Sequence, residues 1–322
     1  MNSKQKSILK ISIPILLSIV AIWYSFSIIP IENLISSFRK ADYAFVLLGA
    51  FMGLLSHLSR AYRWRFQLEP MGYKIKLGNS VMAVFAAYLI NYTIPRAGEV
   101  ARASVLTNYE GIPFEKSFGT IVSERIADMV VMLGIIIVTL FLQFDFIFEK
   151  LSGSISIYKI IITAVLAVII ILILTRTIQK GNSKIILKIK SFVNGLLEGV
   201  LSIFKMKKKW LFIFHTLFIW SMYVLMLYVT SFSIPETSDI PFAAILVGFI
   251  LASFSIAATN GGIGSYPLAI YAAFSIFNIP EDPSIAFGWI MWTSQTLMIM
   301  FFGGISLLYL PFYNRKTSKT NF

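Results

Sequence analysis

Six charged residues lie within otherwise apolar stretches of this 322-residue sequence: Arg96, Glu99, Arg102, Glu124, Arg125 and Asp128. A charge at bilayer depth costs at least about 2.5–3.5 kcal/mol, so such residues normally face a protein interior or water and pair with one another. The spacings of Glu99 to Arg102 and of Glu124 to Asp128 place each pair on one helical face. Three positive and three negative charges therefore predict a paired polar cluster.

Helix breakers stand beside this cluster. Pro95 and Gly98 surround Arg96, and an interrupted helix there leaves backbone N–H groups free to bind an anion. Arginine is also well suited to phosphate, because its planar fork donates two parallel hydrogen bonds. These residues predict a water-accessible site that binds a charged headgroup, and the alternative is a structural ion-pair network at the cytoplasmic end of two helices.

A second break interrupts an apolar stretch that carries no charge, at Asn260, Gly261, Gly262 and Gly264. Its three glycines permit unusual backbone dihedrals and close backbone approach. We expect a second broken helix that lines the same cavity and forms a gate opposite the first break. A tight turn between buried helices is the alternative. No Gly-Lys-Ser/Thr follows, which excludes a phosphate-binding P-loop.

Other chemistries find little support in the sequence. The chain has no cysteine and two histidines, so we expect no cysteine metal site and no histidine cluster. No nucleophile and base pair stands out, and we predict no catalytic residue, no metal and no cofactor. The net charge of +13 does not indicate nucleic-acid binding, because aromatic and basic residues do not alternate on a polar surface.

The elements that carry these residues are membrane helices. Apolar residues make up 57% of the chain and charged residues 13%, against about 25% charged in a typical soluble domain. Six stretches are long and apolar enough to cross a bilayer: 8–29, 42–59, 117–144, 157–175, 210–232 and 284–312. The first lacks a small-residue cleavage site and is therefore interpreted as a retained helix rather than a signal peptide.

The positive charges predict the orientation of the chain. Lysine and arginine concentrate in 60–76 and 176–209, which places these loops and both termini in the cytoplasm. The two broken regions, 77–108 and 242–278, must then each return to the side they came from. Re-entrant hairpins are favoured over two full crossings, because the arm 265–278 is shorter than the roughly 20 residues that a crossing needs.

The resulting order is helix, helix, hairpin, helix in each half, with opposite orientation. We therefore predict an all-α polytopic membrane protein of about six full transmembrane helices plus two re-entrant helical hairpins in an inverted repeat, an architecture common in secondary transporters. A single membrane domain would cover 1–322, with half-repeats of roughly 1–150 and 151–322.

The segment that follows the second predicted helix has a less specific interpretation. Arg60, Arg63, Trp64 and Arg65 are expected to anchor the chain at the membrane interface through snorkelling cations and an aromatic ring, and contact with lipid phosphates is a further role open to them. His57 is expected at the same helix end, and a proton relay is its alternative role.

Three further patterns concern helix packing and helices on the membrane surface. Gly49-x-x-x-Gly53 is a weak helix-packing motif. Residues 183–204 have apolar residues on one helical face with lysines around them, which is typical of an amphipathic helix on the cytoplasmic leaflet; a solvated connector is the alternative. Residues 31–40 are expected to form a similar helix on the outer side.

Taken together, the motifs resemble the flippase-like integral membrane domain of lysylphosphatidylglycerol synthases. The resemblance rests on Pro-x-x-Gly-Glu-x-x-Arg within Asn91 to Arg102, on Glu-Arg-x-x-Asp within Ser123 to Asp128, and on the glycine tip at 261–264. It extends over essentially the whole chain. In two-domain members this domain passes aminoacylated phosphatidylglycerol outward while a separate soluble domain performs the aminoacyl transfer.

The resemblance implies a flippase-like protein of the bacterial cytoplasmic membrane that moves an anionic or aminoacylated phospholipid or a polyprenyl-phosphate-type lipid between leaflets. Because the sequence ends at Phe322 after a short basic tail, we do not expect the lysyltransferase activity. Membrane lipids are the expected partners. Two alternatives stay open: a membrane-embedded enzyme that uses an Asp or Glu as general base, and an accessory partner in envelope lipid or glycan synthesis.

Overall fold

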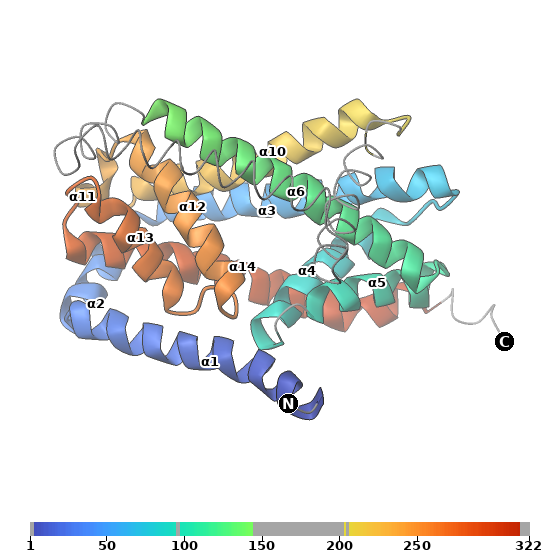
Figure 1. The fold of residues 1–322 in the computed structure, drawn as a ribbon, viewed down its shortest axis with the longest axis horizontal. Helices are drawn as coiled ribbons and strands as arrows, with labels where there is room; N and C mark the ends of the chain where they lie inside the picture. The colour runs from blue at the N-terminus through green and yellow to red at the C-terminus, as the bar shows by residue number, and fades with distance from the viewer. Residues whose placement is uncertain (1–2, 95–96, 144–202, 204–205, 316–322) are drawn as a thin grey trace, which may run out of the picture. The chain divides into compact units, whose positions relative to one another are not determined.

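A computed structural model of the chain describes residues 3–94, 97–143, 203 and 206–315. In these residues all regular structure is helical, as the sequence predicts (Figure 1). The helices are α1 (Ser3–Ile28), α2 (Ile31–Lys40), α3 (Tyr43–Leu68), the 3-10 turn η1 (Glu69–Met71), α4 (Leu77–Thr93), α5 (Ala97–Glu110), α6 (Phe114–Leu142), α10 (Lys209–Ser231), α11 (Pro235–Ser238), α12 (Phe242–Ala258), α13 (Ser265–Ser275) and α14 (Glu281–Tyr313).

The chain divides into two compact units. The first contains Met1–Arg125 and Lys207–Phe322, and the second contains Ile126–Met206. Helix α6 begins in the first unit and continues into the second. The predicted span 157–175 and the predicted amphipathic helix 183–204 lie outside the described residues, apart from Ile203.

Four described helical segments are long and apolar enough to cross a membrane: Tyr43–Met71, Phe114–Leu142, Lys209–Ser231 and Glu281–Tyr313. The bent pair α1 and α2, with an angle of 86° between its arms, is a fifth if it counts as one span. Large apolar side chains such as Leu297, Phe301 and Leu308 on α14 face outward, which suits lipid contact. The chain is therefore an integral membrane protein with several spans.

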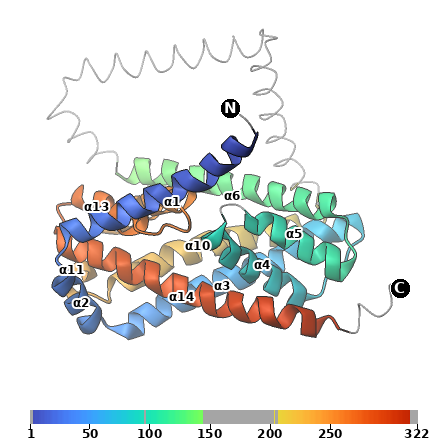
Figure 2. The same cartoon turned by 90° about the horizontal axis from the view of Figure 1, so that it is seen from below.

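The first broken region is a helical hairpin in which α4 packs on α5 (Figure 2). Gly98, in the first turn of α5, approaches α4 closely: a Cβ there would strike the carbonyl of Ala87. Its backbone N–H donates to Oδ1 of Asn91 over 2.8 Å. At the other end of the hairpin, Glu110 accepts hydrogen bonds from the N–H of Lys76 and from Asn79. The start of α4 and the end of α5 therefore lie together at one end of the first unit.

The second broken region is also a hairpin, made of α12 packed on α13. Its outer loops belong to the opposite end of the first unit, where α2 and α11 pack on α14 (Figure 1). There the N–H of Asp42 donates to the carbonyl of Ser233 over 2.8 Å, and Asn33 donates to Asp282 over 2.8 Å. The two hairpins thus enter the first unit from opposite ends, whereas the inverted repeat itself stays a prediction.

Helix α3 packs along α10, and the two glycines of the predicted packing motif lie in this contact. A Cβ on Gly49 would meet Thr230, and a Cβ on Gly53 would meet Met226 and also Gln295 of α14. The small residues therefore let three long helices approach one another, as expected for membrane helix interfaces.

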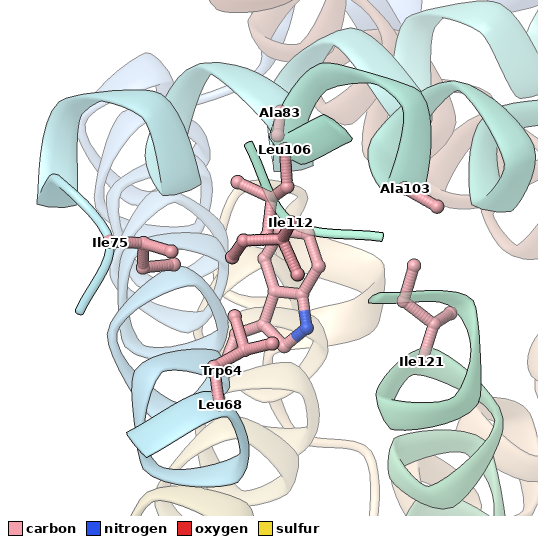
Figure 3. Packing of buried hydrophobic residues seen from close by; sticks show 8 residues of the cluster. All are labelled: Trp64, Leu68, Ile75, Ala83, Ala103, Leu106, Ile112 and Ile121. Atoms are coloured by element: carbon pink, nitrogen blue, oxygen red, sulfur yellow. The ribbon is translucent and has the colours of Figure 1, made fainter. Parts of the chain in front are cut away.

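A compact apolar cluster supports the base of the first hairpin. Its members come from α3, α4, α5, the start of α6 and the loops that join them (Figure 3): Trp64, Leu68, Ile75, Ala83, Ala103, Leu106, Ile112 and Ile121. Trp64 is fully buried there. Ala103 is next to Arg102 in the sequence and Ile121 precedes Glu124 by about one helical turn, so the cluster packs beside the charged residues.

Candidate functional site

The centre of the charged cluster is Glu124 on α6, whose side chain is fully buried. Three arginines converge on its carboxylate. Arg60 donates to Oε1 over 2.7 Å, and Nη2 of Arg63 lies 3.3 Å from the same oxygen. Arg102 binds both oxygens, with Nη1 at 3.1 Å from Oε1 and Nη2 at 3.0 Å from Oε2. One carboxylate therefore holds three guanidinium groups from α3 and α5.

Aromatic and hydroxyl groups hold these arginines in place. The guanidinium of Arg102 lies 3.9 Å from the centre of the Trp64 ring, a cation–π contact. The indole N–H of Trp64 donates to Thr120 over 2.8 Å, which ties α3 to α6. Arg63 donates to Thr216 of α10 over 2.7 Å. These contacts join the charged cluster to α3, α6 and α10.

A second ion pair lies closer to the surface. Arg125 donates to Oε1 of Glu99 over 2.9 Å, and the side chains are 45% and 23% exposed. This pair joins α5 to α6. The sequence places Glu99 and Arg102 on one helical face, but both pair across helices instead, because Arg125 and Glu124 of α6 are within reach of α5.

A narrow polar cleft opens between α3, α4, α5 and the start of α6. It is lined by Arg60, Val84, Ala87, Tyr88, Asn91, Glu99, Arg102 and Arg125. Its free volume is about 10 Å³, which is close to the minimum that a water molecule needs. The described conformation is therefore closed to anything as large as a lipid headgroup.

Arginines outnumber carboxylates around this cleft. Arg60, Arg63, Arg102 and Arg125 are joined to two carboxylates, Glu99 and Glu124. Asp128 follows Glu124 along α6 but belongs to the second unit. Chemically, the cleft suits an anion.

The remaining residues predicted for the first site are distributed as follows. Pro95 and Arg96 lie outside the described residues. Gly98 is buried at the contact of the two hairpin arms. Glu99, Arg102, Glu124 and Arg125 come together, as described above. In the described part of the chain, no group of three or more His, Cys, Asp or Glu side chains is placed to hold a metal ion.

The tip of the second hairpin runs from Thr259 to Gly264. Gly261, Gly262 and Gly264 have φ values of 64°, 78° and 70°, a left-handed conformation that favours glycine. Asn260 is buried, and Thr259 and Ser265 share a hydrogen bond of 2.8 Å across the tip. The glycines are thus required for the shape of this turn.

The two hairpins meet at this tip. Tyr92, from the last turn of α4, packs its ring so closely on Gly261 that a Cβ there would lie 2.7 Å from the ring. The Tyr92 hydroxyl lies 3.2 Å from that of Thr296 on α14. Trp292, also on α14, donates to the carbonyl of Gly261 over 2.8 Å. The tip of the second hairpin therefore contacts the first hairpin, but it does not line the polar cleft described above.

The interpretation of the segment after residue 59 as an interfacial anchor was wrong for most of its residues. Helix α3 continues to Leu68, and Arg60, Arg63 and Trp64 are buried in the cluster. His57 is likewise buried inside the helix and not at its end. Only Arg65, partly exposed over the ring of Tyr62, keeps the expected character.

A signal in the sequence could have revealed these residues. Gly49, Gly53, Ser56, Arg60 and Arg63 recur every three or four residues and so share one helical face. The arginines continue a stripe of small residues that faces other helices, whereas Arg65 falls off the stripe. Charges on such a stripe indicate burial with a partner.

The sequence is similar to those of known membrane proteins. A family model described as the lysylphosphatidylglycerol synthase transmembrane region matches residues 11–304. The chain is 25% identical over 310 residues to the UPF0104 membrane protein of Methanocaldococcus jannaschii, an alignment that covers 87% of the chain and 88% of that relative. It is also 31% identical over 122 residues to the glycosyltransferase AglD of Haloferax volcanii, which amounts to 38% of the chain but 20% of that protein.

Proposed function

The chain belongs to the lysylphosphatidylglycerol synthase transmembrane-region family, and on that premise we propose that it moves a phosphate-bearing lipid between the leaflets of a membrane. The observation that carries the proposal is the cleft lined by Arg60, Arg102 and Arg125, with positive charge in excess. Anionic and aminoacylated phospholipids and polyprenyl phosphates share the phosphate that this cleft suits.

Arginine chemistry supports this assignment. Glu124 orients the fork of Arg102 through two hydrogen bonds, so the guanidinium is already ordered before a ligand arrives. Among the described residues, the buried Nε of Arg102 finds no hydrogen-bond acceptor, and a phosphate oxygen would supply one. A buried charge with ordered donors gains more from an anion than a solvated one does.

Glu99 extends the range of headgroups. Its side chain lines the same cleft beside Arg125 and is 23% exposed. A cationic amino group, such as that of an aminoacyl ester, would pair with Glu99 while the phosphate engages the arginines. The narrowness of the cleft requires that the α4/α5 hairpin moves away from α3 before a headgroup enters, while the acyl chains stay in the bilayer.

The test is lipid movement in proteoliposomes, with tracer phosphatidylglycerol, aminoacyl phosphatidylglycerol and a polyprenyl phosphate. Arg125→Gln removes a cleft donor; a charge-assisted hydrogen bond of about 1.5–3 kcal/mol corresponds to a ten- to hundredfold loss of rate. Lys208→Gln is the matched control, because Lys208 is 46% exposed and also ion-paired, with Glu69, but does not line the cleft. Equal rates for both variants would contradict the proposal.

A second candidate is suggested by the partial similarity to the glycosyltransferase AglD. It is a membrane-embedded enzyme, or an accessory subunit, that acts on a lipid-linked substrate of envelope or glycan synthesis. Glu99 is the exposed carboxylate of the cleft and would serve as general base. Release of phosphate or transfer of a glycosyl group by purified protein would favour the enzyme. Activity that appears only when a partner protein is added would favour the subunit.

The same proposal includes the placement of the chain. We infer a single domain over 1–322 in the cytoplasmic membrane of a bacterium, with half-repeats near 1–150 and 151–322 and with both termini in the cytoplasm. Because the chain contains no cysteine, single cysteines at Lys74 and Glu236 can report each side. Labelling of Lys74→Cys from the cytoplasm and of Glu236→Cys from the opposite side is expected, and the reverse pattern would refute this orientation.

A further inference from the structure

His57 is a buried ionisable group that the lipid site does not use. It lies in the middle of α3, is 4% exposed, and stands one turn before Arg60. An ionisable residue inside a membrane helix is costly and is commonly retained for function, such as a proton relay. We propose that His57 binds a proton whenever an anionic headgroup occupies the cleft, so that lipid and proton cross the membrane together.

Two tyrosines enclose the imidazole. The ring of Tyr88 on α4 packs against it with centroids 4.5 Å apart, and the hydroxyl of Tyr223 on α10 lies 3.4 Å from Nδ1. Phe85 closes a third side, edge-on, at 5.6 Å. The imidazole is therefore held between an apolar wall and two hydroxyl-bearing rings from different helices.

Tyr88 connects this histidine to the cleft. The same ring lines the cleft beside Arg60 and covers His57. The titratable and charged groups that face His57 are Arg60 on its own helix, Tyr88 on α4 and Tyr223 on α10, while α14, which also packs on α3, brings the neutral Gln295 against Gly53. Among the described residues, no carboxylate forms an ion pair or hydrogen bond with the imidazole.

The sign of the coupling follows from these neighbours. A phosphate on Arg60 adds negative charge next to His57, and negative charge favours the imidazolium form. By linkage, a proton on His57 strengthens binding of the anion by the same factor. The proton comes from the aqueous compartment on the side where lipid enters and leaves to the compartment on the other side. The inference deepens the proposed function, on which it rests, by naming the co-transported ion.

The chain offers a matched control in its second histidine. Nδ1 of His215 on α10 shares a 2.8 Å hydrogen bond with the hydroxyl of Ser59 on α3. The ring packs on Tyr62 and Phe66 but does not line the cleft. Both histidines thus bridge α3 and α10. Replacing His215 by glutamine tests the loss of a histidine at this helix contact without touching the ring beside Tyr88.

The transport experiment uses the full chain in phosphatidylcholine liposomes with tracer fluorescent phosphatidylglycerol and a gradient of one pH unit, from pH 6 to pH 7. One pH unit is a tenfold proton ratio, so one-to-one coupling concentrates the tracer about tenfold in the leaflet on the alkaline side. His57→Gln is expected to leave the tracer evenly distributed, and His215→Gln to behave as the wild type. Accumulation of the tracer in the leaflet on the acidic side overturns the proposal. So does accumulation in His57→Gln to the same extent as in the wild type.

A binding experiment separates this inference from the proposed function, because it needs no transport. Dihexanoyl phosphatidylglycerol is added to detergent-solubilised protein in weak buffer at a series of pH values between about 4 and 7, and proton uptake is recorded at each. Wild type and His215→Gln are expected to take up protons, and His57→Gln is not. If His57→Gln does not fold, Tyr223→Phe removes only the hydroxyl beside Nδ1 and is expected to reduce the uptake. Proton uptake by folded His57→Gln or Tyr223→Phe equal to that of the wild type overturns the inference. Proton uptake by a wild type that moves no lipid refutes the proposed transport and leaves the coupling between proton and anion standing.

Discussion

Glu124→Gln is the substitution that most directly tests the buried cluster. The carboxylate makes four contacts of 2.7–3.3 Å with three arginines. If the amide nitrogen takes the place of Oε2, it faces Nη2 of Arg102, so that one donor meets another. Three buried guanidinium groups then share one neutral oxygen. Removing one partner of a buried ion pair costs about 3–5 kcal/mol, and we expect the upper part of that range.

Equilibrium unfolding in mixed micelles, followed by the fluorescence of the six tryptophans, measures this loss as a change in the free energy of unfolding. Glu99→Gln is the matched control, because it neutralises the other carboxylate of the cleft at a site that is 23% exposed and pairs with a single arginine. A partly exposed pair contributes at most about 1 kcal/mol. Equal losses for the two variants, or no loss for Glu124→Gln, would refute the buried cluster.

Three further substitutions test the packing around the site, each by thermal unfolding of purified protein. Gly98→Ala drives a methyl group into α4 and is expected to destabilise by about 1–3 kcal/mol; unchanged stability would contradict the close hairpin. Gly261→Ala combines a φ of 64° with a clash against Tyr92 and should cost on the order of 1–3 kcal/mol, whereas a neutral effect would mean the tips are apart. Thr216→Val removes the hydroxyl that Arg63 donates to, for about 1.5–3 kcal/mol, and a stabilised variant would disprove that contact.

The helical architecture was accessible from the sequence because bilayer crossing imposes length and hydropathy on every span. The stretches 210–232 and 284–312 correspond closely to α10 and α14. The sides assigned to the charged loops also predicted that each broken region returns to the end it came from. The contacts of Glu110 with the start of α4 and the packing of α11 on α14 agree with this. Whether the hairpins re-enter a bilayer stays a prediction.

The charged site was predicted in part. The sequence singled out Arg102 and Glu124 as cluster members, because charges within apolar stretches require partners. It missed Arg60 and Arg63, since three basic residues within six positions also fit a cytoplasmic loop. Only the placement of α3 against α6 makes them buried. Pairing across helices depends on tertiary structure, and the spacing along one helix does not encode it.

The resemblance to the flippase-like domain of lysylphosphatidylglycerol synthases is confirmed at the level of the family by the match over 11–304. The movement of lipid that the resemblance implies is a proposal that this match does not itself contain. The arrangement around Glu124 gives the proposal its physical basis, because ordered arginines line the cleft beside it. Gly261, where the sequence predicts a gate, contacts Tyr92 of the first hairpin.

The measurement that tests the central claim most directly compares two tracer lipids that differ in their phosphate. Fluorescent phosphatidylglycerol and fluorescent glucosylceramide are placed in the same wild-type proteoliposomes, and the accessibility of each headgroup is followed over time. We predict that the protein moves phosphatidylglycerol and leaves glucosylceramide at the rate of protein-free liposomes. Equal acceleration of both lipids, or of neither, would contradict a cleft that recognises the phosphate through its arginines.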